Sequence, residues 1–151
     1  MEDIKRILVV SRTTKYCRKA LQYGVSLAKK CGAELYVIHV VHEPFLFGGW
    51  NLPMPTLQKE YKKALDAAKK ELDAVIDQEK KKGVNIKELI VEGKPTEEIL
   101  KAVKKQKIDL LVMLAHEEGR FEHFLFGRSN DEIFRKLPCS VLMIKNEPQP
   151  A

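Results

Sequence analysis

The chain has 151 residues, of which 44% are hydrophobic and 32% are charged, and its formal net charge is +6. This length suits one domain with one hydrophobic core, and the composition excludes the fibrous and disordered classes of protein. No apolar run approaches the roughly 20 residues that span a bilayer. The charged start of the chain lacks the architecture of a signal peptide. We therefore expect a cytoplasmic protein with no membrane partner.

The positive charge is interleaved with negative charge along the chain. Between Lys59 and Lys82, lysines alternate with acidic residues, which is typical of a solvated helix face. A nucleic-acid-binding protein would instead gather its basic residues on one face. We expect no nucleic-acid partner.

The first half of the chain alternates strand and helix. Residues 4–10 are apolar and rich in β-branched side chains, which predicts a strand. Helical spacing of small and apolar residues follows over 13–31, and residues 35–41 predict a second, buried strand. After the irregular segment 43–56, a long amphipathic helix runs up to Gly83, which ends it.

The second half continues the alternation. Residues 84–91 predict a third strand, and Pro95 is placed at the first turn of the next helix. Residues 108–114 form a near-continuous apolar strand. A short helix over 129–137 and a fifth strand over 139–144 complete the pattern.

Five strands alternating with four helices predict an α/β fold: a three-layer, doubly wound, Rossmann-like parallel sheet with helices on both faces. We expect one domain over residues 1–146 and a short proline-rich tail over 147–151. In such folds ligands bind beyond the carboxyl ends of the strands. The three ends that matter here are residues 10–12, 40–42 and 114–117.

Four stretches of the chain together resemble the universal stress protein family. They are residues 7–10 with 19–21, residues 35–41, residues 92–99, and residues 108–113 with Gly127 and 137–144. The resemblance covers nearly the whole chain. It implies an adenine nucleotide alpha hydrolase-like fold, with five strands in the order 3-2-1-4-5. It also implies a homodimer that forms through the last strand, here Val141, Leu142, Met143 and Ile144.

An apolar last strand also favours dimerisation on physical grounds. Residues 140–145 would leave an apolar sheet edge unpaired in a monomer, and such edges seek partners. Pairing with a second copy would cover this edge.

Members of that family that bind ATP carry the pattern Gly-x2-Gly-x9-Gly-Ser/Thr after the fourth strand. In this chain Leu114 and Glu117 stand at the first two glycines, and only Gly127 remains. Leucine lacks the backbone freedom of glycine, and the carboxylate of Glu117 would repel a polyphosphate. Arg12 replaces the acidic residue of the first strand and cannot accept a hydrogen bond from a ribose. We therefore expect a degenerate nucleotide site and no cofactor.

An alternative interpretation keeps an anion site in this region. Residues 127–129 lead into a helix N-terminus, which favours anions, although Ser129 and Glu132 also have the spacing of a capping box. If a site for ATP, AMP or another anion is retained, it uses Arg12, Val40, Gly127, Arg128, Ser129 and Asn130.

No metal-binding or catalytic motif emerges from the remaining residues. The four histidines lack the spacing of a zinc motif, and His39 is expected to have a supporting role in the core. No serine lies in a Gly-x-Ser-x-Gly motif, so we expect no enzymatic activity. The cysteines are expected to be small core side chains: Cys17, Cys31 and Cys139.

Two aromatic loops follow the second and fourth strands, at the carboxyl edge of the predicted sheet. Such loops are normally polar, so a cluster of aromatic side chains must be buried or bind something. Either these side chains fill the vacant nucleotide cleft, or they present an apolar patch to a protein partner, a neighbouring subunit or an apolar ligand. The residues concerned are Phe45, Phe47, Trp50, Phe121, Phe124 and Phe126.

These features predict a non-enzymatic stress-response or regulatory module that acts through protein contacts. The alternative is a nucleotide-responsive switch that binds ATP, AMP or another anion at the carboxyl ends of the strands.

Overall fold

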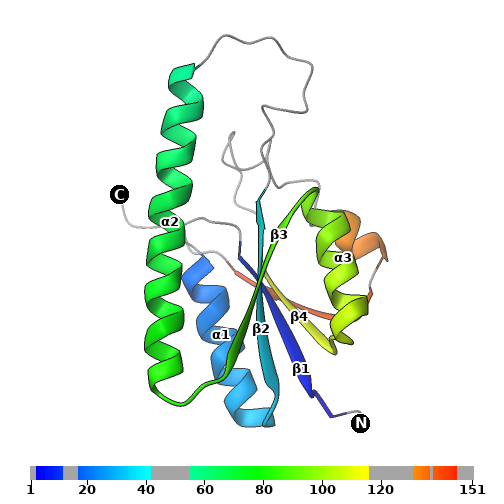
Figure 1. Ribbon diagram of the computed structural model, residues 1–151. Helices are drawn as coiled ribbons and strands as arrows, with labels where there is room; N and C mark the ends of the chain where they lie inside the picture. The colour runs from blue at the N-terminus through cyan, green and yellow to red at the C-terminus, as the bar shows by residue number, and fades with distance from the viewer. Residues whose placement is uncertain (1–2, 12–16, 42–54, 116–130, 137, 146–151) are drawn as a thin grey trace.

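Five parallel strands form a single sheet in the computed structural model, which describes residues 3–11, 17–41, 55–115, 131–136 and 138–145. The order β3-β2-β1-β4-β5 confirms the predicted order 3-2-1-4-5. Figure 1 shows the strands, which are β1 (Arg6–Ser11), β2 (Glu34–Val41), β3 (Ile86–Glu92), β4 (Leu110–Leu114) and β5 (Ser140–Ile144).

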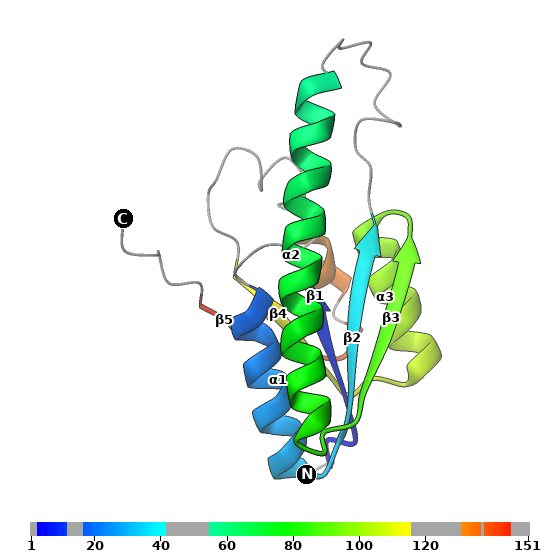
Figure 2. The same cartoon turned by 60° about the vertical axis from the view of Figure 1, so that its left-hand side comes forward.

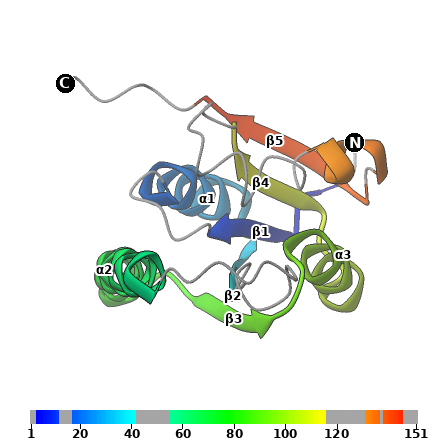
Figure 3. The ribbon, with the colours of Figure 1, turned by 90° about the horizontal axis from the view of Figure 1, so that it is seen from above.

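Helices cover both faces of this sheet, so the predicted three-layer α/β architecture is confirmed. Seen from above, helices α1 (Cys17–Cys31) and α2 (Pro55–Lys81) lie on one face. Helix α3 (Pro95–Gln106) and the short helix over residues 131–136 lie on the other (Figure 3). In side view, α2 extends well past the carboxyl ends of the strands (Figure 2).

Two apolar layers follow from the alternation of side chains along the strands. The layer under α1 and α2 takes one set of strand residues, which includes Ile7, Val9, Leu35, Val37 and Val112. The layer under α3 takes the alternate set, which includes Leu8, Val10, Ile38, Leu111 and Met113. Because β1 and β4 are buried on both faces, their sequences read as continuous apolar runs.

Gly24 brings α1 unusually close to the sheet. A Cβ atom at this position would overlap Val9 Cγ2 and would lie 3.3 Å from Leu35 Cδ1. Glycine is therefore required here by close approach rather than by a turn.

Three helices end in a left-handed residue, which lets the chain leave the helix and enter the next strand. Gly32 after α1 has a φ of +65° and Gly83 after α2 has a φ of +89°. The third position is Lys107 after α3, with φ 52°. Lysine is strained in this conformation, whereas glycine is not.

Several boundaries differ from the sequence expectations. Helix α2 begins at Pro55, inside the segment expected to be irregular, because proline is accepted in a first helical turn. Strand β3 begins at Ile86 rather than residue 84, because Val84 N–H donates to Glu79 O and still closes the end of α2. The expectation that Cys31 is a core side chain was wrong: it is exposed, since the last turn of α1 passes the edge of the core.

No helix among the described residues is both long and apolar enough to cross a membrane.

Candidate functional site

The carboxyl ends of the strands form the edge at which open α/β sheets bind ligands. Of the six residues expected to hold a nucleotide or anion, Val40 alone is described. The other five lie outside the described residues, and so do all six residues of the aromatic loops. The first group is Arg12, Gly127, Arg128, Ser129 and Asn130, and the second is Phe45, Phe47, Trp50, Phe121, Phe124 and Phe126.

Leu114 is the described residue that bears most directly on nucleotide binding. It is the last residue of β4, its side chain is 5% exposed, and it belongs to the apolar layer under α1 and α2. It pairs in register with Ile144, and the next N–H, that of Ala115, donates to Ile144 O at 2.7 Å. The position where the resemblance implies a glycine is therefore occupied by a packed core side chain.

Val40 lies near the carboxyl end of β2. Its partly buried side chain packs against the layer under α3, and it pairs with Val91 of β3. Its side chain therefore contributes to the core, and only its backbone could contribute polar contacts to a ligand.

Ser11 and His39 meet at the same edge. They are register partners on β1 and β2, and Ser11 is 4% exposed. The Ser11 Oγ and His39 Nδ1 atoms are 3.5 Å apart, which is the long limit of a hydrogen bond. The contact links the carboxyl-terminal part of β1 to that of β2.

Burial lowers the pKa of His39 below its usual 6.5, because the half-buried ring is poorly solvated in its charged form. The ammonium of Lys69 lowers it further, whereas the carboxylates of Asp73 and Glu88 raise it. Burial and the neighbouring Lys69 ammonium therefore disfavour the charged imidazolium form of His39.

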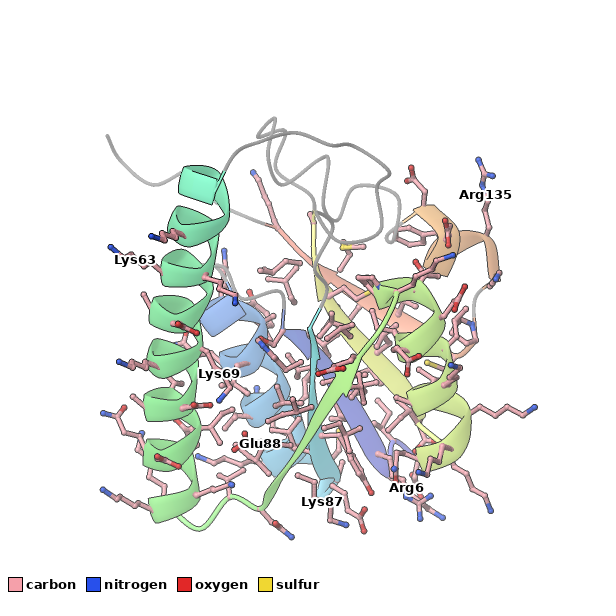
Figure 4. The ribbon with its side chains drawn as sticks, turned by 45° about the horizontal axis from the view of Figure 1, so that its top comes forward. Arg6, Lys63, Lys69, Lys87, Glu88 and Arg135 are labelled. Atoms are coloured by element: carbon pink, nitrogen blue, oxygen red, sulfur yellow. The ribbon has the colours of Figure 1, made fainter. Side chains whose placement is uncertain are left out.

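A small cavity lies beside His39, between α2 and strands β2 and β3. Its volume is about 10 Å³, roughly the space of one water molecule. Lys69 of α2 and Glu88 of β3 both line it, and Figure 4 labels these two side chains. The lining residues are Val37, His39, Lys69, Asp73, Ile76, Glu88 and Ile90.

The charges around this cavity are already paired. Lys69 Nζ lies 3.2 Å from Asp73 Oδ2, and Lys80 Nζ lies 3.4 Å from Glu88 Oε1. Among the described residues, no three His, Cys, Asp or Glu side chains are grouped so that they could hold a metal ion. The sequence did not predict this cavity. It predicted only that Lys69 and Asp73, four residues apart on one helix, would be neighbours.

The two edge strands of the sheet differ in character. Strand β3 carries Lys87, Glu88 and Glu92, and charged residues on an edge oppose pairing with other strands. Strand β5 carries no charge, and three of its apolar residues remain partly exposed: Val141, Leu142 and Met143. Its last residue, Ile144, is 4% exposed and belongs to the core.

Comparison with known proteins gives a consistent result. The model of the universal stress protein family matches residues 3–145. A universal stress protein of Methanocaldococcus jannaschii is 30% identical over 146 residues, which cover 93% of this chain and 82% of the relative.

Solved structures share the fold. The universal stress protein UspA from Lactobacillus plantarum has a TM-score of 0.67 and 22% identity, covering 95% of this chain and 99% of that one. A family protein from Arabidopsis thaliana, solved with AMP bound, has a TM-score of 0.60 and 17% identity, covering 95% and 92%. The match of the family model to almost the full length places this chain in the universal stress protein family.

Proposed function

We propose that this universal stress protein is a non-enzymatic regulatory module that acts through protein contacts, with a nucleotide site that has degenerated. The observation that carries the proposal is the burial of Leu114 at the end of β4. The proposal also includes a homodimer that forms through β5.

Leu114 supports the loss of ATP binding for a steric reason. A phosphate cradle needs main-chain N–H groups that a ligand can approach closely, and glycine permits this approach. Here the side chain at the first glycine position is packed in the apolar layer under α1 and α2. A leucine in that layer cannot move aside without exposing apolar surface to water, which costs about 2 kcal/mol.

The uncharged β5 edge supports the dimer. Pairing it with a second copy would cover Val141, Leu142 and Met143 and would satisfy the outer backbone groups of the strand. The charged β3 edge offers no comparable surface.

Calorimetric titration with ATP-Mg tests the degenerate site. We expect no binding tighter than about 100 μM, which corresponds to about −5.5 kcal/mol. Denaturing the purified protein and measuring the absorbance of the supernatant near 260 nm would also reveal any nucleotide that copurifies. Tight binding, or stoichiometric nucleotide release, would refute the degenerate site.

The protein-contact part of the proposal needs a separate experiment. The double variant Phe47→Ser, Trp50→Ser alters one aromatic loop, and Tyr23→Ser is a control at an exposed aromatic residue of α1. Affinity capture is carried out with the wild type, the double variant and the control as baits. We expect the wild type and the control to recover the same partner proteins and the double variant to lose some of them. Identical recoveries from all three baits would contradict a role for this loop.

A nucleotide-responsive switch is the second candidate function. It is favoured by the similar structure from Arabidopsis thaliana that holds AMP, and AMP lacks the triphosphate that Glu117 would repel most strongly. Titration with AMP, for the wild type and for Arg128→Ala, separates the two functions. Binding of AMP that is weakened in the variant would establish the switch.

A further inference from the structure

The last turns of three helices carry lysine pairs that the fold brings to one end of the molecule. They are Lys29 and Lys30 on α1, Lys80 and Lys81 on α2, and Lys104 and Lys105 on α3. We call these six residues the basic end. In the sequence the three pairs are separated by long stretches of mixed charge.

The convergence follows from the topology. All five strands are parallel, so each helix runs back from the carboxyl edge and ends where the next strand starts. The amino ends of the strands and the carboxyl ends of α1, α2 and α3 therefore share one end of the molecule (Figure 1). Arg6 and Lys87, at the starts of β1 and β3, lie at the same end (Figure 4).

Acidic residues neutralise only part of this charge. Glu79 lies between two cations, 3.8 Å from Lys29 Nζ and 3.4 Å from Lys82 Nζ. Glu34 likewise lies 3.8 Å from Arg6 and 3.3 Å from Lys87.

Four lysines of the basic end have no acidic partner in the part of the chain that the structure describes: Lys30, Lys81, Lys104 and Lys105. All four are exposed. The carboxyl end of each helix carries a partial negative charge of about half an elementary charge, which attracts cations. The three helix ends together therefore offset only part of the positive charge of these four lysines.

The chemistry of the basic end identifies the kind of partner. Its six residues are all lysines, whereas protein interfaces are depleted in lysine and enriched in aromatic residues and arginine. Among the described residues, the large exposed hydrophobic side chains lie elsewhere: Tyr23, Ile90 and Phe134. The partner is therefore recognised by charge and not by apolar contacts.

A flat anionic surface fits better than a nucleic acid. Proteins contact nucleic-acid phosphates with lysine and arginine side chains together with backbone N–H groups and helix N-termini, whereas this end combines its lysines with helix C-termini, whose free backbone groups are carbonyls. The helices that contribute the lysines lie on both faces of the sheet (Figure 3), so the charges spread over an area instead of following a line. Lysines near an anionic bilayer are attracted without precise geometry.

We propose that the basic end docks the protein reversibly on membranes that contain anionic lipids. The sequence, which shows neither an apolar span nor a signal peptide, led us to expect no membrane partner. The proposal departs from that expectation because the tertiary arrangement gathers the lysine pairs at one end of the molecule. The absence of an apolar anchor at the described part of this end makes the binding purely electrostatic, so it should be sensitive to salt.

Sedimentation with vesicles tests this inference in the full-length protein. Vesicles with 30% phosphatidylserine in phosphatidylcholine are compared with pure phosphatidylcholine at 0.1 M and 0.5 M NaCl. We expect binding to the anionic vesicles at low salt only. Each neutralised lysine should weaken it by up to about fivefold.

A matched pair of variants locates the surface. The quadruple variant Lys30→Gln, Lys81→Gln, Lys104→Gln, Lys105→Gln should reduce binding at least tenfold. The control Lys59→Gln, Lys62→Gln, Lys63→Gln, Lys70→Gln makes the same change in net charge on exposed residues of α2, and Figure 4 shows Lys63 pointing away from the sheet. The control should bind like the wild type.

Three outcomes would overturn the proposal: no binding of the wild type to anionic vesicles, equal losses in both quadruple variants, or binding that survives 0.5 M NaCl.

Titration with duplex DNA provides a further arm. If the basic end binds DNA more tightly than vesicles, its partner is a nucleic acid and not a membrane. If the quadruple variant is unfolded by circular dichroism, the pair Lys104→Gln, Lys105→Gln replaces it, with Lys62→Gln, Lys63→Gln as its control.

Discussion

Gly24→Ala is the substitution for which the structure gives the clearest balance of opposing effects. In a solvent-exposed helix, replacing glycine by alanine stabilises by about 1 kcal/mol. At Gly24 the new methyl group would overlap Val9 Cγ2. Val9 is 1% exposed and lies on a central strand, and its β-branched side chain has little rotamer freedom.

Overpacking of this kind costs about 1–3 kcal/mol. The second neighbour, Leu35 Cδ1 at 3.3 Å, is the end of a longer side chain and can yield by a few tenths of an ångström. Because Val9 is buried and rigid, the cost of its clash lies in the upper part of this range, at about 2–3 kcal/mol. Less the helix gain of about 1 kcal/mol, the net loss of stability is about 1–2 kcal/mol. For a chain of this length that corresponds to a decrease in Tm of about 2–8 °C.

A double-mutant cycle isolates the clash. Val9→Ala removes Cγ2 and, by itself, costs about 2 kcal/mol through lost burial and the resulting cavity. In that background Gly24→Ala should be neutral or stabilising, which gives a coupling of about 2 kcal/mol between the two sites. Ser26→Ala, at an exposed position of α1, controls for helix propensity and should not destabilise.

The assay is urea unfolding followed by circular dichroism at one fixed protein concentration, because dimerisation would make the apparent stability depend on concentration. If the two substitutions are additive to within about 0.5 kcal/mol, or if Gly24→Ala alone stabilises the protein, the close approach of α1 to β1 is not as described.

Three further predictions use the same physical reasoning. The pKa of His39 is lowered below 6.5 in the folded protein, so the unfolded chain binds the proton more strongly and the wild type should lose stability as the pH falls below about 6.5. His39→Asn should lose less stability over this pH range, and parallel curves of unfolding free energy against pH for the two proteins would contradict this. Lys107→Gly should stabilise by about 0.5–1 kcal/mol by relieving the left-handed conformation with φ 52°, and a fall in Tm would refute it. Met143→Lys on β5 should yield monomers in analytical ultracentrifugation, whereas Ile90→Lys at the opposite edge, where the side chain is 57% exposed, should not; equal effects would count against pairing through β5.

Local sequence patterns predict single elements of the candidate site but not the contacts between its elements. That Leu114 ends an apolar strand was evident from the sequence, because residues 108–114 are almost all apolar. The contact between Ser11 and His39, 28 residues apart, depends on the register of β1 against β2. The cavity beside His39 requires the placement of α2 against two strands, which no periodicity specifies.

The helices, the strands and the layered architecture could be predicted from local patterns in the sequence. Apolar runs, helical spacing, Pro95 and the helix-ending glycines Gly32 and Gly83 act over a few residues, so they can be read locally, and they agree with the elements observed. The resemblance of motifs then gave the strand order, which the sheet confirms.

The surfaces that these elements present depend on the tertiary arrangement. It left Cys31 exposed although the helical spacing placed it with the core, and it made β5 an uncharged edge and β3 a charged one. It also gathered the lysine pairs of three distant helix ends into one basic end. The physical reason is that exposure and the summation of charge depend on distances in space between segments far apart in the chain, and these distances are fixed by the parallel topology and not by any local pattern.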